Sequence, residues 1–134
     1  MPTRTRLSVL LAACLGVAPA GAQTPDYWSR DQADRGERLY AGHCAVCHGA
    51  RLEGASATAL SGATFDARWP GSGLTVDDLL YIVQTQMPWG DPGRLTRNQY
   101  LDIVAHLLAA NGYPGGPAGL PTDAASLAGR RLAR

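Results

Sequence analysis

Apolar residues follow helical spacing in three segments of the chain, residues 31–42, 76–86 and 97–110. The residues that share a face are Ala33, Gly36 and Tyr40 in the first segment, Val76, Leu80 and Val83 in the second, and Tyr100, Ile103, Val104, Leu107 and Leu108 in the third. Spacing of three and four positions places such residues on one side of an α-helix, where they can be buried together. The pattern therefore predicts three main helices.

Signals for helix ends agree with these segments. Thr75 with Asp78 and Thr96 with Gln99 match the capping box, in which each of the two side chains accepts a hydrogen bond from the backbone N–H of the other residue. The second helix should end where a proline follows Met87, because the residue before a proline avoids helical geometry. These signals fix where the second and third helices begin and where the second one stops.

The segments outside the helices differ in composition. Residues 49–73 are rich in Gly, Ala, Ser and Thr without a sustained period, which predicts one long loop, and a loop of that length in a small domain usually wraps something. Residues 114–134 are rich in Gly, Pro and Ala, and we expect a flexible tail with at most weak helix over residues 123–132. No segment has the pattern of a strand, so the expected class is all-α.

Residues 1–22 have the features of a secretory signal peptide. Arg4 and Arg6 provide the basic start, residues 7–18 the apolar stretch and residues 20–22 a cleavage site of small residues. We therefore expect a periplasmic protein that begins near Gln23, with one domain over residues 23–113. The apolar stretch is shorter than the roughly 20 residues that a membrane-spanning helix needs, so no transmembrane segment is expected in the mature chain.

A second interpretation of the leader stays open, because residues 11–14 resemble a lipoprotein signal that would leave Cys14 lipidated. Cleavage after Ala22 would instead remove Cys14 and leave Cys44 and Cys47 as the remaining cysteines. All twelve basic residues are arginine, against eleven acidic residues, so the mature chain is close to neutral. A nucleic-acid partner is not expected, since such binding requires a basic surface.

The residues that carry chemistry are Cys44, Cys47 and His48, in the order Cys-Ala-Val-Cys-His. In the haem-attachment pattern each thiol binds one vinyl group of a haem and the histidine then binds the iron. A thioredoxin-type redox pair and half of a zinc site also use two cysteines at this spacing. The redox pair belongs beside a strand–helix–strand pattern, which is missing here, and the zinc site needs further ligands, so we expect one covalent haem c.

Met87 is the candidate for the second axial ligand of the iron. It is the one methionine left after removal of the leader, and a thioether ligand raises the reduction potential relative to two histidines. The alternative is that Met87 only extends the apolar face of its helix, since methionine often fills gaps in cores. We interpret His43 as a surface residue, and His106 as a packing residue of the third helix rather than a ligand.

These motifs resemble class I cytochromes c over residues 31–113, and the residues that carry the resemblance are Gly36, Tyr40, Cys44 to Gly49, Met87, Pro88 and the last helix. The resemblance implies the cytochrome c fold, with three main helices and a long loop wrapped around the haem. It also implies that Gly36 meets the Tyr100 and Ile103 face of the last helix, because a missing Cβ permits close approach.

Two positions depart from that family. Thr58 stands nearest the place of a proline whose carbonyl usually bonds the ligating imidazole, so we expect another carbonyl of the loop to orient His48. His106 stands where a tyrosine is common. Phe65, Trp69 and Trp89 should supply most of the aromatic surface of the pocket, and Trp69 either donates its indole N–H to a propionate or anchors the loop.

Residues 87–93, 100–105 and 111–114 further resemble small cytochromes that accompany periplasmic quinoprotein (PQQ) dehydrogenases. This resemblance implies an electron carrier rather than an enzyme, which receives single electrons from such a dehydrogenase and passes them to another cytochrome or a terminal oxidase. Two alternatives stay open. One is a peroxidase-like haem enzyme or gas sensor, which requires an open sixth iron position. The other is the cytochrome subunit of a sulfur-oxidising complex.

Overall fold

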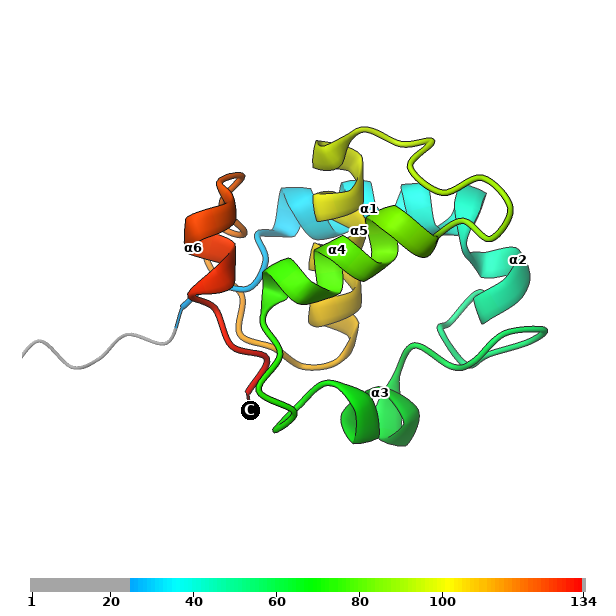
Figure 1. Ribbon diagram of the computed structural model, residues 1–134, viewed down its shortest axis with the longest axis horizontal. Coiled ribbons are helices and arrows are strands. Elements are labelled where there is room, and N and C mark those ends of the chain that lie inside the picture. Colours follow the sequence, from blue (N-terminus) through cyan, green and yellow to red (C-terminus); the bar gives the residue numbers. More distant parts are fainter. Residues whose placement is uncertain (1–24, 134) are drawn as a thin grey trace, which may run out of the picture.

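A computed structural model describes residues 25–133 of the 134-residue chain. Its helices, shown in Figure 1, are α1 Arg30–His43, α2 Ala45–His48, α3 Gly62–Arg68, α4 Val76–Gln86, α5 Arg97–Ala110 and α6 Ala124–Ala128. Helices α1, α4 and α5 are the three main helices that the apolar spacing predicts, and residues 25–133 form no strand beyond a single bridge between Thr75 and Arg131. The expected signal peptide and Cys14 lie outside the described residues. Across residues 25–133, no helix combines the length and apolarity needed to cross a bilayer.

The main helices begin at capping boxes. Both predicted boxes are present: Thr75 with Asp78 opens α4, and Thr96 with Gln99 opens α5. In the first of them the N–H of Thr75 donates to the Asp78 carboxylate at 2.8 Å, and the N–H of Asp78 donates to the Thr75 hydroxyl at 3.3 Å. Helix α4 ends at its C-cap Met87, as the following proline requires. The sequence thus locates both ends of α4.

Helices α1 and α5 cross at Gly36. A Cβ placed on Gly36 would lie 1.9 Å from the carbonyl oxygen of Asp102 and 2.9 Å from Cβ of His106, so the crossing is possible only without a side chain. The expected contact with the Tyr100 and Ile103 face is therefore wrong in register. Gly36 lies over the backbone of α5 at Asp102, because its missing side chain lets backbone meet backbone.

Side chains on both sides of this crossing join the two helices. Arg35 donates from Nε and Nη2 to the two carboxylate oxygens of Asp102, each at 2.8 Å. The half-buried imidazole of His106 packs against the ring of Tyr40, with centroids 5.4 Å apart. The interpretation of His106 as a packing residue is confirmed, and burial lowers its pKa below the usual value.

The long segment after the haem-attachment motif is not one uninterrupted loop, because it contains α3. Within α3, Phe65 is 2% exposed and packs against Trp69 and Tyr113, with ring centroids 6.2 and 6.4 Å apart. A helix of seven residues with one large apolar side chain has no visible period, and its stability comes from tertiary contacts. The spacing of apolar residues in the sequence therefore could not predict α3.

The C-terminal segment differs from the expected flexible tail. Leu127 in α6 and Leu132 after it are 0% and 1% exposed. The backbone also pairs with the chain before α4, since the N–H of Leu132 donates to Leu74 and the N–H of Val76 donates to Arg130, both at 2.9 Å. The expectation of a flexible tail was wrong because the composition of the whole segment gives little weight to a few leucines. These leucines are buried against α4 and the residues just before it. In Figure 1 α6 lies at the end of the molecule away from α2.

Candidate functional site

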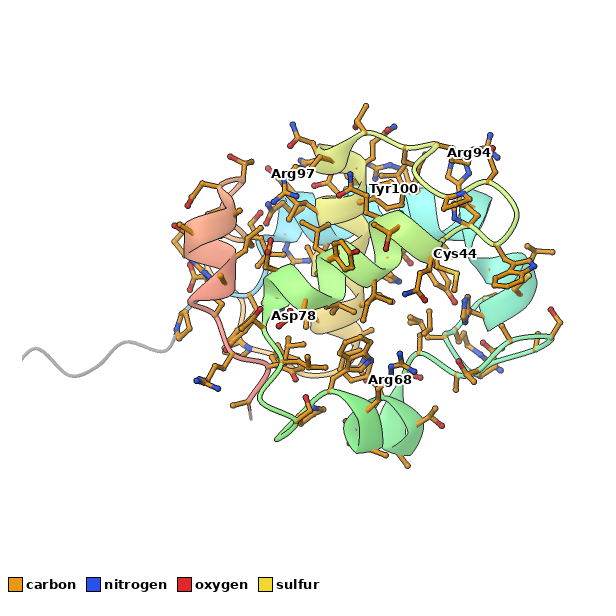
Figure 2. All side chains as sticks on the ribbon, in the orientation of Figure 1. Cys44, Arg68, Asp78, Arg94, Arg97 and Tyr100 are labelled. Carbon is orange, nitrogen blue, oxygen red and sulfur yellow. The ribbon has the colours of Figure 1, made fainter. Side chains whose placement is uncertain are left out.

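A cavity of about 950 Å³ lies among α2, α3, α4, α5 and the loop between α2 and α3. Apolar side chains from three helices form much of its wall, namely Phe65, Leu79, Ile82, Val83, Ile103 and Leu107. Figure 2 labels two of the lining residues, Cys44 beside α2 and Arg68 beside α3. Helices α3, α4 and α5 thus supply an apolar wall, and the segment around α2 supplies the reactive groups.

Cys44, Cys47 and His48 all line this cavity. Cys44 is the residue between α1 and α2, and the single turn of α2 brings Cys47 and His48 to the same side while Val46 is 82% exposed. Both thiols are free rather than joined in a disulfide. Burial raises the pKa of Cys44 to about 11, with the neighbouring Cys47 as a lesser cause. A redox-active thiol needs a lowered pKa, so the structure does not favour a thioredoxin-type pair.

The imidazole of His48 is held in one orientation by the loop. His48 is 8% exposed, and its Nδ1 lies 2.7 Å from the carbonyl oxygen of Thr58. A carbonyl oxygen only accepts, so Nδ1 carries the proton and Nε2 keeps its lone pair. The orienting carbonyl was expected elsewhere in the loop, but it belongs to Thr58 itself. A backbone carbonyl does not depend on the side chain, so threonine serves where proline is usual.

Met87 reaches the same cavity from another element. It is half-buried at the carboxyl end of α4, where its N–H donates to the carbonyl of Val83 at 3.1 Å. The hydroxyl of Tyr100 in α5 donates to the Met87 carbonyl at 2.8 Å. The structure therefore brings together all four residues that the sequence predicted as cofactor or iron ligands, from segments that are far apart in the chain.

The aromatic residues expected at the pocket take different positions. Phe65 and Trp69 line the cavity and are buried, whereas Trp89 lines it while 88% exposed, so Trp89 lies at its edge. Arg68, which the sequence reasoning missed, also lines the cavity, and its guanidinium carbon lies 5.2 Å from the centroid of the Trp69 ring. The feature of the sequence that could have pointed to Arg68 is the tryptophan that follows it, because an arginine can place its guanidinium over an aromatic ring. His43 lies half-buried at the cavity rather than fully on the surface.

The residues present fit a covalently bound haem. The cavity offers two free thiols at the attachment spacing, an imidazole with Nε2 available, a thioether and an apolar wall. Over residues 25–133, no three His, Cys, Asp or Glu side chains gather so as to hold a bare metal ion. The chemistry of the ligating groups and the apolar wall of the cavity are therefore both what a covalently bound haem requires.

Comparisons with known proteins lead to the same class. The family model described as cytochrome c oxidase, cbb3-type, subunit III matches residues 31–107, more than half of the chain. Comparison with curated protein sequences gives no significant match. Among solved structures, a chain of the sulfane dehydrogenase SoxCD from Paracoccus pantotrophus is similar, with a TM-score of 0.54 and 24% identity over 96% of this chain and 67% of that chain. This likeness supports the fold.

The matched residues 31–107 contain all of α1 but its first residue, the attachment motif, the cavity wall and most of α5. The family match and the site geometry thus rest on the same part of the molecule. The chain belongs to the family of cytochrome c oxidase, cbb3-type, subunit III, and is a class I c-type cytochrome with an all-α fold.

Proposed function

We propose that this protein is a periplasmic monohaem electron carrier in which Cys44 and Cys47 would hold the haem and His48 and Met87 would ligate its iron. The observation that carries the proposal is that the attachment motif and Met87 line one apolar cavity from separate elements. Bound haem supplies a one-electron couple between ferric and ferrous iron. The protein's own part is to fix both ligands and to exclude water from the ring.

The wall next to Met87 supports a carrier over a haem enzyme or gas sensor. A peroxidase-like enzyme needs an open sixth iron position and a group that moves protons beside it. The residues that α4 contributes to the cavity are Leu79, Ile82, Val83 and Gln86. Three of these are apolar and the fourth is an amide, which does not act as a general acid or base at neutral pH.

The surface at the cavity edge supports contact with another protein. Val46 is 82% exposed and Trp89 is 88% exposed, and both line the cavity. Exposed apolar residues beside a redox centre allow a partner to approach it closely without ordering charged groups. Since the mature chain is close to neutral, we expect the rate of electron transfer to depend only modestly on salt.

The proposed donor is a quinoprotein (PQQ) dehydrogenase, on the sequence resemblance of residues 87–93, 100–105 and 111–114. The acceptor would then be another cytochrome or a terminal oxidase. A second candidate partner is a sulfur-oxidising complex, since a chain of the sulfane dehydrogenase SoxCD has the same fold. The two candidates make opposite predictions about which reduced enzyme transfers electrons to this protein.

Stopped-flow mixing tests the proposed function and separates the two donors. The ferric protein is mixed with a reduced quinoprotein dehydrogenase or with a reduced sulfane dehydrogenase, and the haem absorbance is followed. We expect rapid reduction by the quinoprotein dehydrogenase and no consumption of peroxide by the reduced product. Turnover of peroxide would contradict the proposed function as an electron carrier. Rapid reduction by the sulfane dehydrogenase alone would show that the donor is the sulfur-oxidising complex and not the quinoprotein dehydrogenase.

A pair of variants tests the docking surface in the same assay. Trp89→Ala removes an exposed aromatic ring at the cavity edge, whereas Tyr81→Ala removes one that is 65% exposed on α4 and does not line the cavity. We expect the first substitution to slow the second-order reduction by about tenfold, the effect of a moderate interface contact. The second should leave the rate unchanged, and equal effects would exclude docking at this edge.

A further inference from the structure

Both backbone polar groups of Met87 are bonded to helices. Its N–H donates to the carbonyl of Val83 within α4 at 3.1 Å. Its carbonyl accepts from the hydroxyl of Tyr100 in α5 at 2.8 Å. The first bond continues the α4 helix, but the second joins Met87 to a different helix. The position of this residue is therefore defined by two elements at once.

The residues that follow Met87 make few other contacts that would hold its carbonyl group in place. Residues 89–94 are exposed. Their polar contacts are local, since the N–H of Asp91 donates to the Pro88 carbonyl at 3.0 Å and Arg94 lies 3.7 Å from the Asp91 carboxylate. Such contacts shape the turn without fixing it to the core. Tyr100 supplies the connection to the core at the point where the turn begins.

Tyr100 itself is well held. It is 1% exposed, and the capping box of Thr96 and Gln99 lies directly before it in the first turn of α5. Figure 2 shows Tyr100 near the carboxyl end of α4. A buried hydroxyl is costly without a partner, so the hydroxyl and the carbonyl of Met87 hold one another in place. A rigid donor on a capped helix restricts the backbone on which the thioether depends.

We infer that Tyr100 is a positioning residue for the sulfur ligand, because its hydroxyl fixes the Met87 carbonyl and thereby keeps the thioether facing the cavity. This role rests on the proposed ligation by Met87. Tyr100 would act by shifting the equilibrium between the thioether bound to the iron and the thioether released from it. Loss of the hydroxyl should raise the released population, to which external ligands of the iron can bind.

Tyr100→Phe tests the role, with Tyr27→Phe as a matched control. Tyr27 is also buried, 5% exposed, and also donates its hydroxyl to a backbone carbonyl, that of Arg131, but it does not line the cavity. Each variant is purified with its haem attached. The measurements are thermal unfolding, the weak red absorption band of a thioether bound to ferric haem, and imidazole binding to the ferric protein.

Both variants should lose similar stability, since each loses one hydroxyl-to-carbonyl bond. In Tyr100→Phe we expect a weaker red band and imidazole affinity that rises roughly 2- to 12-fold, the factor that one net hydrogen bond gives. Tyr27→Phe should retain the wild-type band and affinity. If the two variants bind imidazole alike while the wild type shows the band, the role of Tyr100 is wrong and the ligation stands. If the wild type lacks the band, Met87 is not a ligand and both proposals fail.

Discussion

At the scale of single residues, the haem-attachment motif could be recognised in the sequence because its chemistry is local. Cys44, Cys47 and His48 are close in the chain, and one turn of helix brings them to the same cavity. The carbonyl that orients His48 could not be assigned, because it depends on how the following loop folds back. The structure gives that role to Thr58, at 2.7 Å from Nδ1.

His106 provides a residue-scale prediction about pH. Burial lowers its pKa, and the nearby carboxylate of Glu37 opposes that effect to a smaller extent. Because the folded pKa lies below the unfolded value of about 6.5, the unfolded chain binds more protons in this range and stability falls as pH drops below that value. Replacing His106 with Phe should keep the packing on Tyr40 and flatten this dependence.

Urea unfolding of wild type and His106→Phe at a series of pH values measures the effect. The difference in unfolding free energy between the two proteins should change below about pH 6.5 and stay constant above it. A constant difference across the whole range would show that His106 does not titrate differently on folding. Glu37 is present in both proteins, so its own titration cancels to first order.

At the scale of elements, the helix ends were predictable and the register of the crossing was not. A capping box is a contact between residues three positions apart, so Thr75 with Asp78 and Thr96 with Gln99 define their helices without tertiary information. The register of α1 on α5 depends on the whole contact, and the predicted face was wrong. The short helix α3 was missed for the same reason, because packing of Phe65 stabilises it.

Two glycines of α1 give a matched test of the crossing. A Cβ at Gly36 would lie 1.9 Å from the Asp102 carbonyl oxygen, whereas a Cβ at Gly42 would have nothing within 4 Å. Gly36→Ala should destabilise the domain by about 3 kcal/mol, because backbone cannot yield as a flexible side chain does. Gly42→Ala should stabilise it by roughly 0.5–1 kcal/mol, since alanine is the better helix former.

Thermal or urea unfolding of the haem-loaded variants gives both values. Equal behaviour of the two variants would contradict the close approach of α1 to α5. The Arg35–Asp102 pair lies beside the same crossing, with both hydrogen bonds at 2.8 Å. Its arginine side chain is about half exposed, so we attribute the specificity of the crossing to the glycine rather than to the ion pair.

At the scale of the whole molecule, the C-terminal segment belongs to the folded domain. Composition predicted a flexible tail, because Gly, Pro and Ala dominate residues 114–134. Three buried leucines fix this segment to the rest of the domain, namely Leu120, Leu127 and Leu132, each at most 3% exposed. Their partners are distant in sequence, so no local pattern could reveal the packing.

Leu127→Ala tests this packing, with Ser126→Ala as its control on the same short helix. Leu127 is fully buried and Ser126 is exposed. The leucine substitution should cost about 2–5 kcal/mol of unfolding free energy, the range for truncating a buried leucine. The serine substitution should cost little. A loss below about 1 kcal/mol for Leu127→Ala would indicate that the segment does not pack on the domain.

The proposed function depends above all on one haem held between His48 and Met87. The absorption spectrum of the ferric protein tests it most directly, because a bound thioether gives a weak band near the red edge of the visible. Met87→Ala should abolish that band, lower the reduction potential and open the iron to carbon monoxide and cyanide. Gln86→Ala is the control, since Gln86 also lines the cavity and has no thioether.

The haem should remain on the polypeptide of Met87→Ala after denaturation and acid–acetone extraction, because Cys44 and Cys47 are unchanged. We expect the red band in wild type and Gln86→Ala and its loss in Met87→Ala. A wild-type protein that lacks the band and binds carbon monoxide freely would contradict it. In that case the sixth position is open, and a haem enzyme or gas sensor becomes the better assignment.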